Sequence, residues 1–286
     1  MNAILRSEFG SRVGNERLLL LKEDGEIMKY YVVADVHGFY SELIKALTQK
    51  GWFDDKGPRK LIVCGDLFDR GEQANEMQKF IVELMEKDEI ILIRGNHEDL
   101  MVEFVEHLDY WMDTRIFYSH HWQNGTVETM LRLVGLDLNV AYARPNLAAG
   151  KMRQTPYFKK ILPAMRNFYE TDRYIFVHGW IPCDAFGEQQ YRPREYFYRD
   201  DWRKARKKDW ELARWYNGMD AAAQGVIEKE KTIVCGHYRC SYGHEKYENG
   251  GVDKGINYAP YYGNGIIAID GSTCHSHIVN CLVLED

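Results

Sequence analysis

Apolar and polar positions alternate regularly between residues 28 and 95. Continuous apolar runs predict buried strands at 30–35, 60–65 and 89–95. Apolar residues at helical spacing predict amphipathic helices at 40–52 and 74–88. The resulting βαβαβ order makes neighbouring strands parallel, so their carboxyl ends gather at one edge of the sheet, where ligands bind in open α/β folds.

The rest of the chain predicts a helical insertion followed by a second sheet. Residues 100–170 are mostly helical in pattern and rich in Trp, Tyr and Met, which suits a cap beside the strand ends. Strand patterns return at 173–179, 231–237, 265–271 and 277–286, and they suit a second, mixed or antiparallel sheet. We therefore expect one α/β (α+β) domain over residues 28–286, with the helical insertion at about 100–170.

Residues 1–27 fit poorly with this pattern, because the segment MKYYVVADVHG from Met28 already reads as a first strand. We expect translation to start at Met28 if the source is bacterial, which would make residues 1–27 an N-terminal extension absent from the native protein. An ordinary N-terminal hairpin is the alternative. Mass analysis of the N-terminus of protein made from its own locus would show which start is used.

Composition excludes several classes of protein. The chain of 286 residues is 45% hydrophobic and 28% charged, as in soluble globular proteins, and its formal net charge is −6. This charge disfavours nucleic acid or an anionic membrane as a partner, although a local basic pocket stays open. No apolar stretch reaches the length of a membrane span and no signal-peptide pattern is found, so we expect a cytoplasmic protein. The six cysteines include no CxxC pair and are expected to be reduced and mostly buried.

Potential metal ligands follow five of the predicted strands. The strand-end segments are ADVHG with Asp35 and His37, CGDLFDRG with Asp66, RGNHED with Asn96 and His97, VHGW with His178 and CGHY with His237. Carboxylate oxygens, an amide oxygen and imidazoles together suit divalent manganese, iron or zinc. Taken singly, each residue has a structural explanation, such as a helix cap for Asp66 or a core histidine for His178. The ordered set favours a two-metal site.

These motifs carry a family resemblance. The order DxHG, GDxxDRG, GNHE, HG and GH across residues 35–237 resembles the calcineurin-like metallophosphoesterases, in particular the PPP serine/threonine phosphatase type. The segment WQNGTVETML at 122–131 and the C-terminal strands are similar to those of bacterial members. The resemblance implies a four-layer αββα sandwich, with two central mixed sheets flanked by helices.

The resemblance also implies two metal sites. One metal would be held by Asp35, His37 and Asp66, and the other by Asp66, Asn96, His178 and His237. Asp66 would bridge the two ions. A hydroxide shared by the metals would attack the phosphorus atom of the substrate.

Further matching residues receive roles in acid catalysis and substrate binding. His97, oriented by Asp69, would protonate the leaving group. Arg70 would bind phosphoryl oxygens, with Asn96 and Arg94 as further contacts. The remaining candidate for substrate binding is Arg214 in ELARWYNGM, because bacterial members carry an arginine in a similar segment.

One motif departs from the wider superfamily. Many members have GHxH as the last motif, with the second His as a metal ligand, whereas this chain has GHYR with Arg239. This difference favours the PPP branch. Tyr238 and Trp180 stand where many bacterial members have smaller residues, and both would reshape the substrate entrance.

The leading hypothesis is direct hydrolysis of a phosphomonoester, with phosphoserine or phosphothreonine in proteins as the substrate. The expected cofactors are two divalent metal ions, Mn or alternatively Fe or Zn. A bis(5'-nucleosyl)-tetraphosphatase is the alternative enzyme, and an RNA-end phosphatase or cyclic phosphodiesterase is a third. The intact Asp69 and His97 pair favours the phosphatase, because bacterial symmetrical tetraphosphatases commonly differ at the position of Asp69. A metal-stapled phosphopeptide-binding protein is the non-enzymatic alternative, which the retained general acid disfavours.

Three further features have competing interpretations. His275 and His277 could form another metal pair, and so could His120 and His121, but exposed histidines at the ends of elements are common without a ligand. The run RDDWRKARKKDW at 199–210 could hold RNA or a phosphoprotein, whereas a solvated helix face with its tryptophans packed inward is the favoured interpretation.

Overall fold

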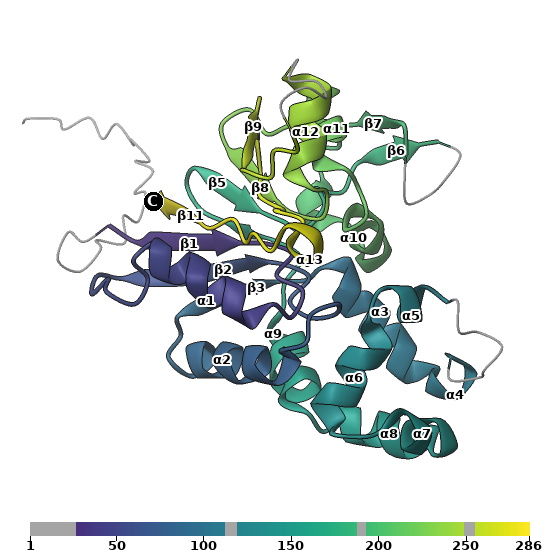
Figure 1. Cartoon of the computed structure of the whole chain (residues 1–286). Helices are drawn as coiled ribbons and strands as arrows, with labels where there is room; N and C mark the ends of the chain where they lie inside the picture. The colour runs from purple at the N-terminus through teal and green to yellow at the C-terminus, as the bar shows by residue number, and fades with distance from the viewer. Residues whose placement is uncertain (1–26, 112–118, 188–192, 249–254) are drawn as a thin grey trace, which may run out of the picture.

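The computed structural model describes residues 27–111, 119–187, 193–248 and 255–286 (Figure 1). The predictions for residues 1–27 therefore lie, apart from Ile27, outside the described residues. The described part contains a four-stranded sheet, a five-stranded sheet and a two-stranded sheet, with helices around them.

The first sheet has the strand order β11-β1-β2-β3. Its three parallel strands are β1 (Lys29–Val33), β2 (Arg59–Cys64) and β3 (Ile90–Ile93), connected by α1 (Tyr40–Gln49) and α2 (Ala74–Glu86). This is the predicted βαβαβ unit. Both helices end two or three residues earlier than predicted, because the chain turns with positive φ at Gly51 and Asp88.

The C-terminal strand β11 (Leu282–Glu285) lies in the first sheet, so our assignment of it to the second sheet is wrong. It pairs antiparallel with β1, with Tyr31 opposite Val283. Without β11, β1 would be an edge strand with an unpaired row of backbone N–H and C=O groups. The C-terminus therefore completes the sheet that the N-terminal half of the domain begins.

The second sheet is mixed, with the order β4-β5-β8-β10-β9. Its strands are β4 (Tyr169–Glu170), β5 (Tyr174–Phe176), β8 (Thr232–Cys235), β10 (Ile266–Ala268) and β9 (Tyr261–Gly263). The three central strands are parallel and the two edge strands antiparallel. A separate hairpin contains β6 (Asp184–Phe186) and β7 (Glu195–Phe197).

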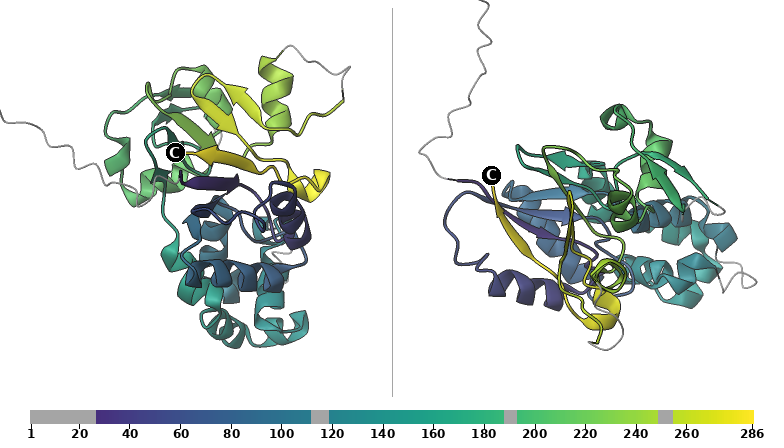
Figure 2. Two further views of the ribbon diagram at one scale, coloured as in Figure 1. Left: turned by 90° about the vertical axis from the view of Figure 1, so that its left-hand side faces the viewer. Right: turned by 90° about the horizontal axis from the view of Figure 1, so that it is seen from above.

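Helices dominate the segment between β3 and β4. They are α3 (Asn96–Glu106), α4 (Leu108–Trp111), α5 (His120–Gln123), α6 (Thr126–Val134), α7 (Leu138–Ala143), α8 (Pro145–Met152), the π-helix η3 (Tyr157–Ile161) and α9 (Leu162–Ala164). The later helices are the 3₁₀-helix η4 (Trp202–Lys204), α10 (Lys207–Ala213), α11 (Gly218–Ala223), α12 (Cys240–Tyr247) and α13 (Thr273–Ser276). Figure 2 shows α6, α7 and α8 in a lobe that extends away from the sheets. Among the described helices, none has the length and apolarity needed to cross a membrane.

The buried apolar residues form layers on and between the two large sheets. Side chains alternate along β1, so Tyr31 and Val33 pack toward the helices α1 and α2, while Tyr30 and Val32 face the second sheet. Phe176 of β5 meets this inner face. A separate cluster lies on the outer side of the second sheet. The predicted fold of two central sheets flanked by helices is therefore confirmed.

The aromatic residues of the 199–210 run point into the molecule. Trp202 and Trp210 are buried, and both pack against Phe168 with ring centroids 5.1 Å and 5.4 Å away. Arg206 and Lys207 lie on the exposed side. The structure therefore confirms the favoured interpretation, a solvated face with its tryptophans packed inward.

Candidate active site and metal centre

A cavity of about 970 Å³ opens at the carboxyl ends of the central strands. Seven predicted site residues line it: Asp35, His37, Asp66, Arg70, Asn96, His97 and His237. His178 and Asp69 lie behind this wall, and each is 1% exposed. Strands β1, β2, β3, β5 and β8 each end two or three residues before one of the proposed metal ligands. The two sheets thus bring together strand ends from distant parts of the sequence.

The backbone at these strand ends is left-handed. Six predicted site residues have φ between 50° and 69°: Asp35, His37, Asp66, Asp69, Arg70 and His237. This conformation is uncommon for residues other than glycine and costs on the order of 1–3 kcal/mol each. Strained residues persist only where the surrounding packing holds them. Their gathering in one cavity is typical of a functional site.

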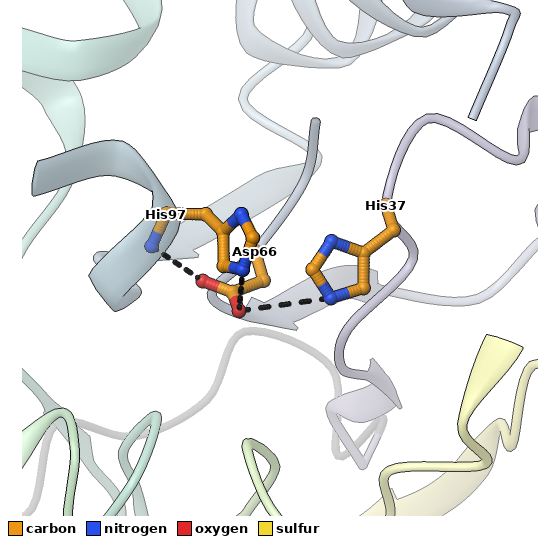
Figure 3. Close-up of side chains that lie close together, drawn as sticks. All are labelled: His37, Asp66 and His97. Carbon is orange, nitrogen blue, oxygen red and sulfur yellow. Dashed lines mark hydrogen bonds and ion pairs between the residues drawn. The ribbon is translucent and has the colours of Figure 1, made fainter. Parts of the chain in front are cut away.

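His37, Asp66 and His97 form the first group of side chains suited to a metal ion (Figure 3). Asp66 Oδ2 lies 3.7 Å from His37 Nε2 and 3.9 Å from His97 Nε2. Asp66 Oδ1 accepts a hydrogen bond of 3.0 Å from the backbone N–H of His97. The carboxylate is therefore fixed between α3 and the β1 loop.

Asp66, His178 and His237 form the second group. Asp66 Oδ1 is 3.4 Å from His178 Nε2, and that nitrogen is 2.8 Å from Asn96 Oδ1. Asp35 Oδ2 accepts a hydrogen bond of 2.8 Å from the backbone N–H of His237. Asp66 belongs to both groups, which is the position of a ligand that bridges two ions.

Two backbone carbonyls set the tautomers of the histidines. His37 Nδ1 is 3.0 Å from the carbonyl oxygen of Phe68, and His178 Nδ1 is 2.8 Å from that of Cys64. A carbonyl oxygen only accepts, so each Nδ1 carries a proton, and each Nε2 faces the side chains grouped around Asp66. Metal-binding histidines are commonly oriented in this way.

The four imidazoles grouped around Asp66 differ in proton affinity. Burial lowers the pKa of His37 well below its usual value, lowers that of His178, and lowers that of His237 to about 3. Burial also opposes protonation of His97, but Asp66 and the hydrogen bond to Asp69 raise its pKa overall. Burial thus disfavours the charged form of three imidazoles, which suits metal ligands, whereas the neighbouring carboxylates favour the charged form of His97.

The carboxylates crowd one another. Burial, Asp270 and Asp66 raise the pKa of Asp35 well above its usual value, and burial and Asp66 raise that of Asp270 to about 6. Burial alone would raise the pKa of Asp66, but the surrounding imidazoles, His178 foremost, lower it. Divalent cations among these oxygens would relieve the repulsion. This donor set of carboxylates, neutral imidazoles and one amide oxygen fits such ions.

Asp69 holds the imidazole of His97 from behind. Its Oδ2 lies 2.8 Å from His97 Nδ1 and accepts a second hydrogen bond of 2.9 Å from the hydroxyl of Thr126. Thr126 begins α6, so the helical segment buttresses the pair. His97 Nε2 is left facing the cavity, where a leaving group would need a proton.

Arg70 reaches across the cavity. Its Nη1 lies 3.0 Å from His37 Nε2, and its Nη2 lies 3.1 Å from His97 Nε2 and 3.3 Å from Asn124 Oδ1. A metal ion on His37 Nε2 has to displace the first of these bonds. The guanidinium is then available to an anion in the same space.

Arg94 and Arg214 lie outside the lining of this cavity. Both bind Asp99: Arg94 Nε at 2.7 Å and Arg214 Nη1 at 2.5 Å. Arg214 also donates to Asn167 at 2.7 Å and is only 5% exposed. In the structure these two arginines join α3 to the segment before β4 and to α10, rather than facing the metal ligands.

Two residues on the cavity wall and one buried behind it have no role in the predictions from sequence. Arg239 is exposed on its wall, and Asp270 follows β10 as the other ligands follow their strands. Glu98, the last letter of GNHE, is fully buried and accepts hydrogen bonds from the backbone N–H groups of Gly95, Asp66 and Leu67. The sequence signal for Glu98 was its place in the GNHE motif. Asp270 had the strand-end signal, in the segment IAIDG.

The structure does not bring His275 and His277 together, and it confirms the expected free cysteines. His275 lines the cavity, whereas His277 lies beside Glu42 at 3.4 Å, so they do not face one point. The six cysteines are free thiols, as expected. Cys274 is the half-buried one and lies 3.8 Å from Arg70 Nη1.

Fold and site together define a metallophosphoesterase. The family model for calcineurin-like phosphoesterases matches residues 28–253, and the chain therefore belongs to this family.

Similar proteins include two named bis(5'-nucleosyl)-tetraphosphatase PrpE [asymmetrical]. The one from Geobacillus sp. (strain WCH70) is 34% identical over 83 residues, which is 27% of this chain and 34% of that protein. The one from Halalkalibacterium halodurans is 23% identical over 169 residues, 56% of this chain and 60% of that protein. The matches thus span about one to two thirds of these relatives. A solved cold-active protein tyrosine phosphatase has the same fold, with a TM-score of 0.50 at 20% identity over 90% of this chain and 73% of that one.

Proposed function

We propose that this protein is a metal-dependent hydrolase of phosphomonoesters, with phosphoserine and phosphothreonine in proteins as the leading substrates. The observation that carries the proposal is the place of Asp66 in two groups of potential metal ligands, with His97 and its partner Asp69 beside them. The pKa values of His37, His178 and His237 are lowered, while that of His97 is raised. Neighbouring groups whose pKa values are pushed apart commonly divide the roles of ligand, acid and base.

Asp35, His37 and Asp66 are the proposed ligands of one ion. Asp66, Asn96, His178 and His237 are those of the other. When bound, two divalent cations supply a water of lowered pKa and neutralise phosphoryl oxygens, and Mn²⁺ is the first choice, with Fe or Zn as alternatives. The chain holds Asp66 between both groups through the backbone N–H of His97.

His97 is the proposed general acid, and Asp69 keeps its imidazolium in place. A serine or threonine alkoxide is a poor leaving group, so its departure benefits strongly from protonation. Arg70 and Asn96 are proposed to bind the phosphoryl oxygens, and Arg239 replaces Arg214 in our proposal as the second cation. Arg94 and Arg214 instead fix α3 through Asp99.

The test is turnover of a phosphothreonine peptide by metal-stripped protein resupplied with Mn²⁺, with Asp66→Asn as the control. Turnover by the wild type that the control lacks would support the proposal. Absence of turnover on any phosphoester, with both ions bound, would overturn it in favour of a phosphopeptide-binding protein.

A bis(5'-nucleosyl)-tetraphosphatase is the second candidate, favoured by the names of the two relatives described above. In such a substrate the leaving group is a nucleotide phosphate, which departs without a proton more readily than an alkoxide. His97→Ala should therefore reduce hydrolysis of the phosphothreonine peptide by about 10²–10⁴-fold and that of diadenosine tetraphosphate much less. If wild-type protein cleaves the dinucleotide far faster than the peptide, the second candidate replaces the first.

A further inference from the structure

Three more potential metal ligands lie outside the active site, between α3 and α5. Glu103 comes from α3, and the adjacent His120 and His121 come from α5. Their ligand atoms all lie within 4.8 Å of one another. The two helices lie side by side (Figure 1). The sequence pattern alone offered only the two histidines, because Glu103 is 17 positions away in number and reaches them through the fold.

The spacing of the side chains suits one small cation. His120 Nε2 lies 3.7 Å from Glu103 Oε2, and the ring centroids of His120 and His121 are 4.0 Å apart. Ligands at about 2.0–2.2 Å from a tetrahedral zinc ion are separated by roughly 3.3–3.5 Å. A small rotation of the exposed Glu103 and His120 side chains brings their ligand atoms to this separation.

His121 gives the group a fixed member. It is fully buried, and its ring packs against Phe104 with a centroid distance of 5.1 Å. The ring is therefore held in one orientation, with a nitrogen within 4.8 Å of the ligand atoms of Glu103 and His120.

Ions can reach the group from solvent. Glu103 and His120 line a cavity of about 630 Å³, separate from the one at the strand ends apart from the shared wall of Trp215. The wall carries both acidic and basic side chains, and Arg94 and Lys207 pair with Asp99 and Glu211. The cavity therefore provides access for an ion, while the ligands themselves select it.

We propose that Glu103, His120 and His121 bind one zinc ion at a site distinct from the dinuclear centre. Two imidazoles and one carboxylate favour zinc over magnesium or calcium, and three protein ligands leave the fourth position to water. The ion joins α5 to α3.

The proposed site is connected to the active site through Asn124. The amide nitrogen of Asn124 donates to the backbone oxygen of His120 at 2.8 Å, and its Oδ1 accepts from Arg70 at 3.3 Å. An ion on His120 therefore restrains the segment that holds Arg70.

The test is equilibrium dialysis of metal-stripped protein against Zn²⁺, with bound zinc per chain measured by elemental analysis. The variant is Glu103→Gln/His120→Ala, whose side chains are 46% and 44% exposed in the native protein, so its fold should be unaffected. The matched control is Glu83→Gln/His107→Ala, which makes the same two changes at exposed positions outside the lining of this cavity. We expect the wild type and the control to bind one zinc ion more than the variant.

A second comparison separates this site from the dinuclear centre. In an Asp66→Asn background, one zinc ion should remain bound, and adding Glu103→Gln/His120→Ala should weaken its affinity at least about a hundredfold. The proposal is overturned if the variant binds as many zinc ions as the wild type, or if the control loses the same ion. Neither result depends on turnover, so the proposed hydrolase activity stands or falls separately.

Discussion

Replacing Asp69 by Asn tests the acid assignment, because it removes the charge behind His97 and keeps the size of the side chain. Asp69 is 1% exposed, and its Oδ2 lies 2.8 Å from His97 Nδ1. Asp66 and Asp69 raise the pKa of His97 against burial, so loss of one carboxylate lowers it. In Asp69→Asn the charged imidazole loses its nearest compensating charge, while the amide oxygen can still accept from Nδ1.

This loss should depend on the leaving group. For a phosphothreonine peptide, kcat should fall about 10–100-fold, because the proton donor is less often charged and less well oriented. An aryl phosphate with an activated phenol needs little protonation, so its kcat should change less than about threefold. A general acid acts only below its pKa, and the alkaline limb of the pH–rate profile should therefore move to lower pH in Asp69→Asn.

Thr126→Val is the matched control. It removes the 2.9 Å hydrogen bond to the same Oδ2 but leaves the charge. Its effect on kcat should be smaller, with the alkaline limb near its wild-type position. Equal losses for both leaving groups in Asp69→Asn, or an unmoved alkaline limb, would refute His97 as the general acid.

Three further outcomes follow from the contacts. A Cβ at Gly236 would overlap Asp35 Oδ2, so Gly236→Ala should weaken Mn²⁺ binding at least about tenfold in a metal titration, and unchanged binding would contradict this. Arg239→Ala should raise KM for the anionic substrate several-fold with little change in kcat, whereas a loss confined to kcat would assign Arg239 another role. The hydrogen bond from Arg203 foremost lowers the pKa of Glu170 to about 2, below its unfolded value, so this stability is present above about pH 4.3 and lost toward pH 2. Glu170→Gln should cost roughly 1–2 kcal/mol of unfolding free energy at pH 7 and little near pH 2 in urea titrations, since the partly exposed pair is screened.

The βαβαβ unit could be read from the sequence because each strand is a continuous apolar run with a polar end. The partner of β11 could not be read in this way. An apolar run shows that a strand is buried, but the register of Tyr31 against Val283 is set by packing between distant segments. Helix ends were overestimated for a similar reason, since the periodic pattern continues through Lys50 and Lys87 while the backbone turns.

The proposed ligands were accessible from the sequence because parallel strands share an edge. The arginines were not. The ion pair of Arg214 with Asp99 joins residues 115 positions apart, and no local pattern records it. Arg239 had a sequence signal, its replacement of a histidine in GHxH, but that signal identified a branch of the family and not a place on the cavity wall.

The glycines of the motifs show how sequence and site are related in this fold. In GD, GNH and GH each glycine looks like a turn residue, yet in the structure it makes room for a ligand from another strand. A Cβ at Gly95 would overlap Asp66, one at Gly236 would overlap Asp35, and one at Gly65 would overlap His178. These three strand ends therefore contribute a ligand and also the space for a ligand from another strand end. The motifs are coupled through this contact, and a side chain at any one of the three glycines should disturb a metal ligand that belongs to a different motif.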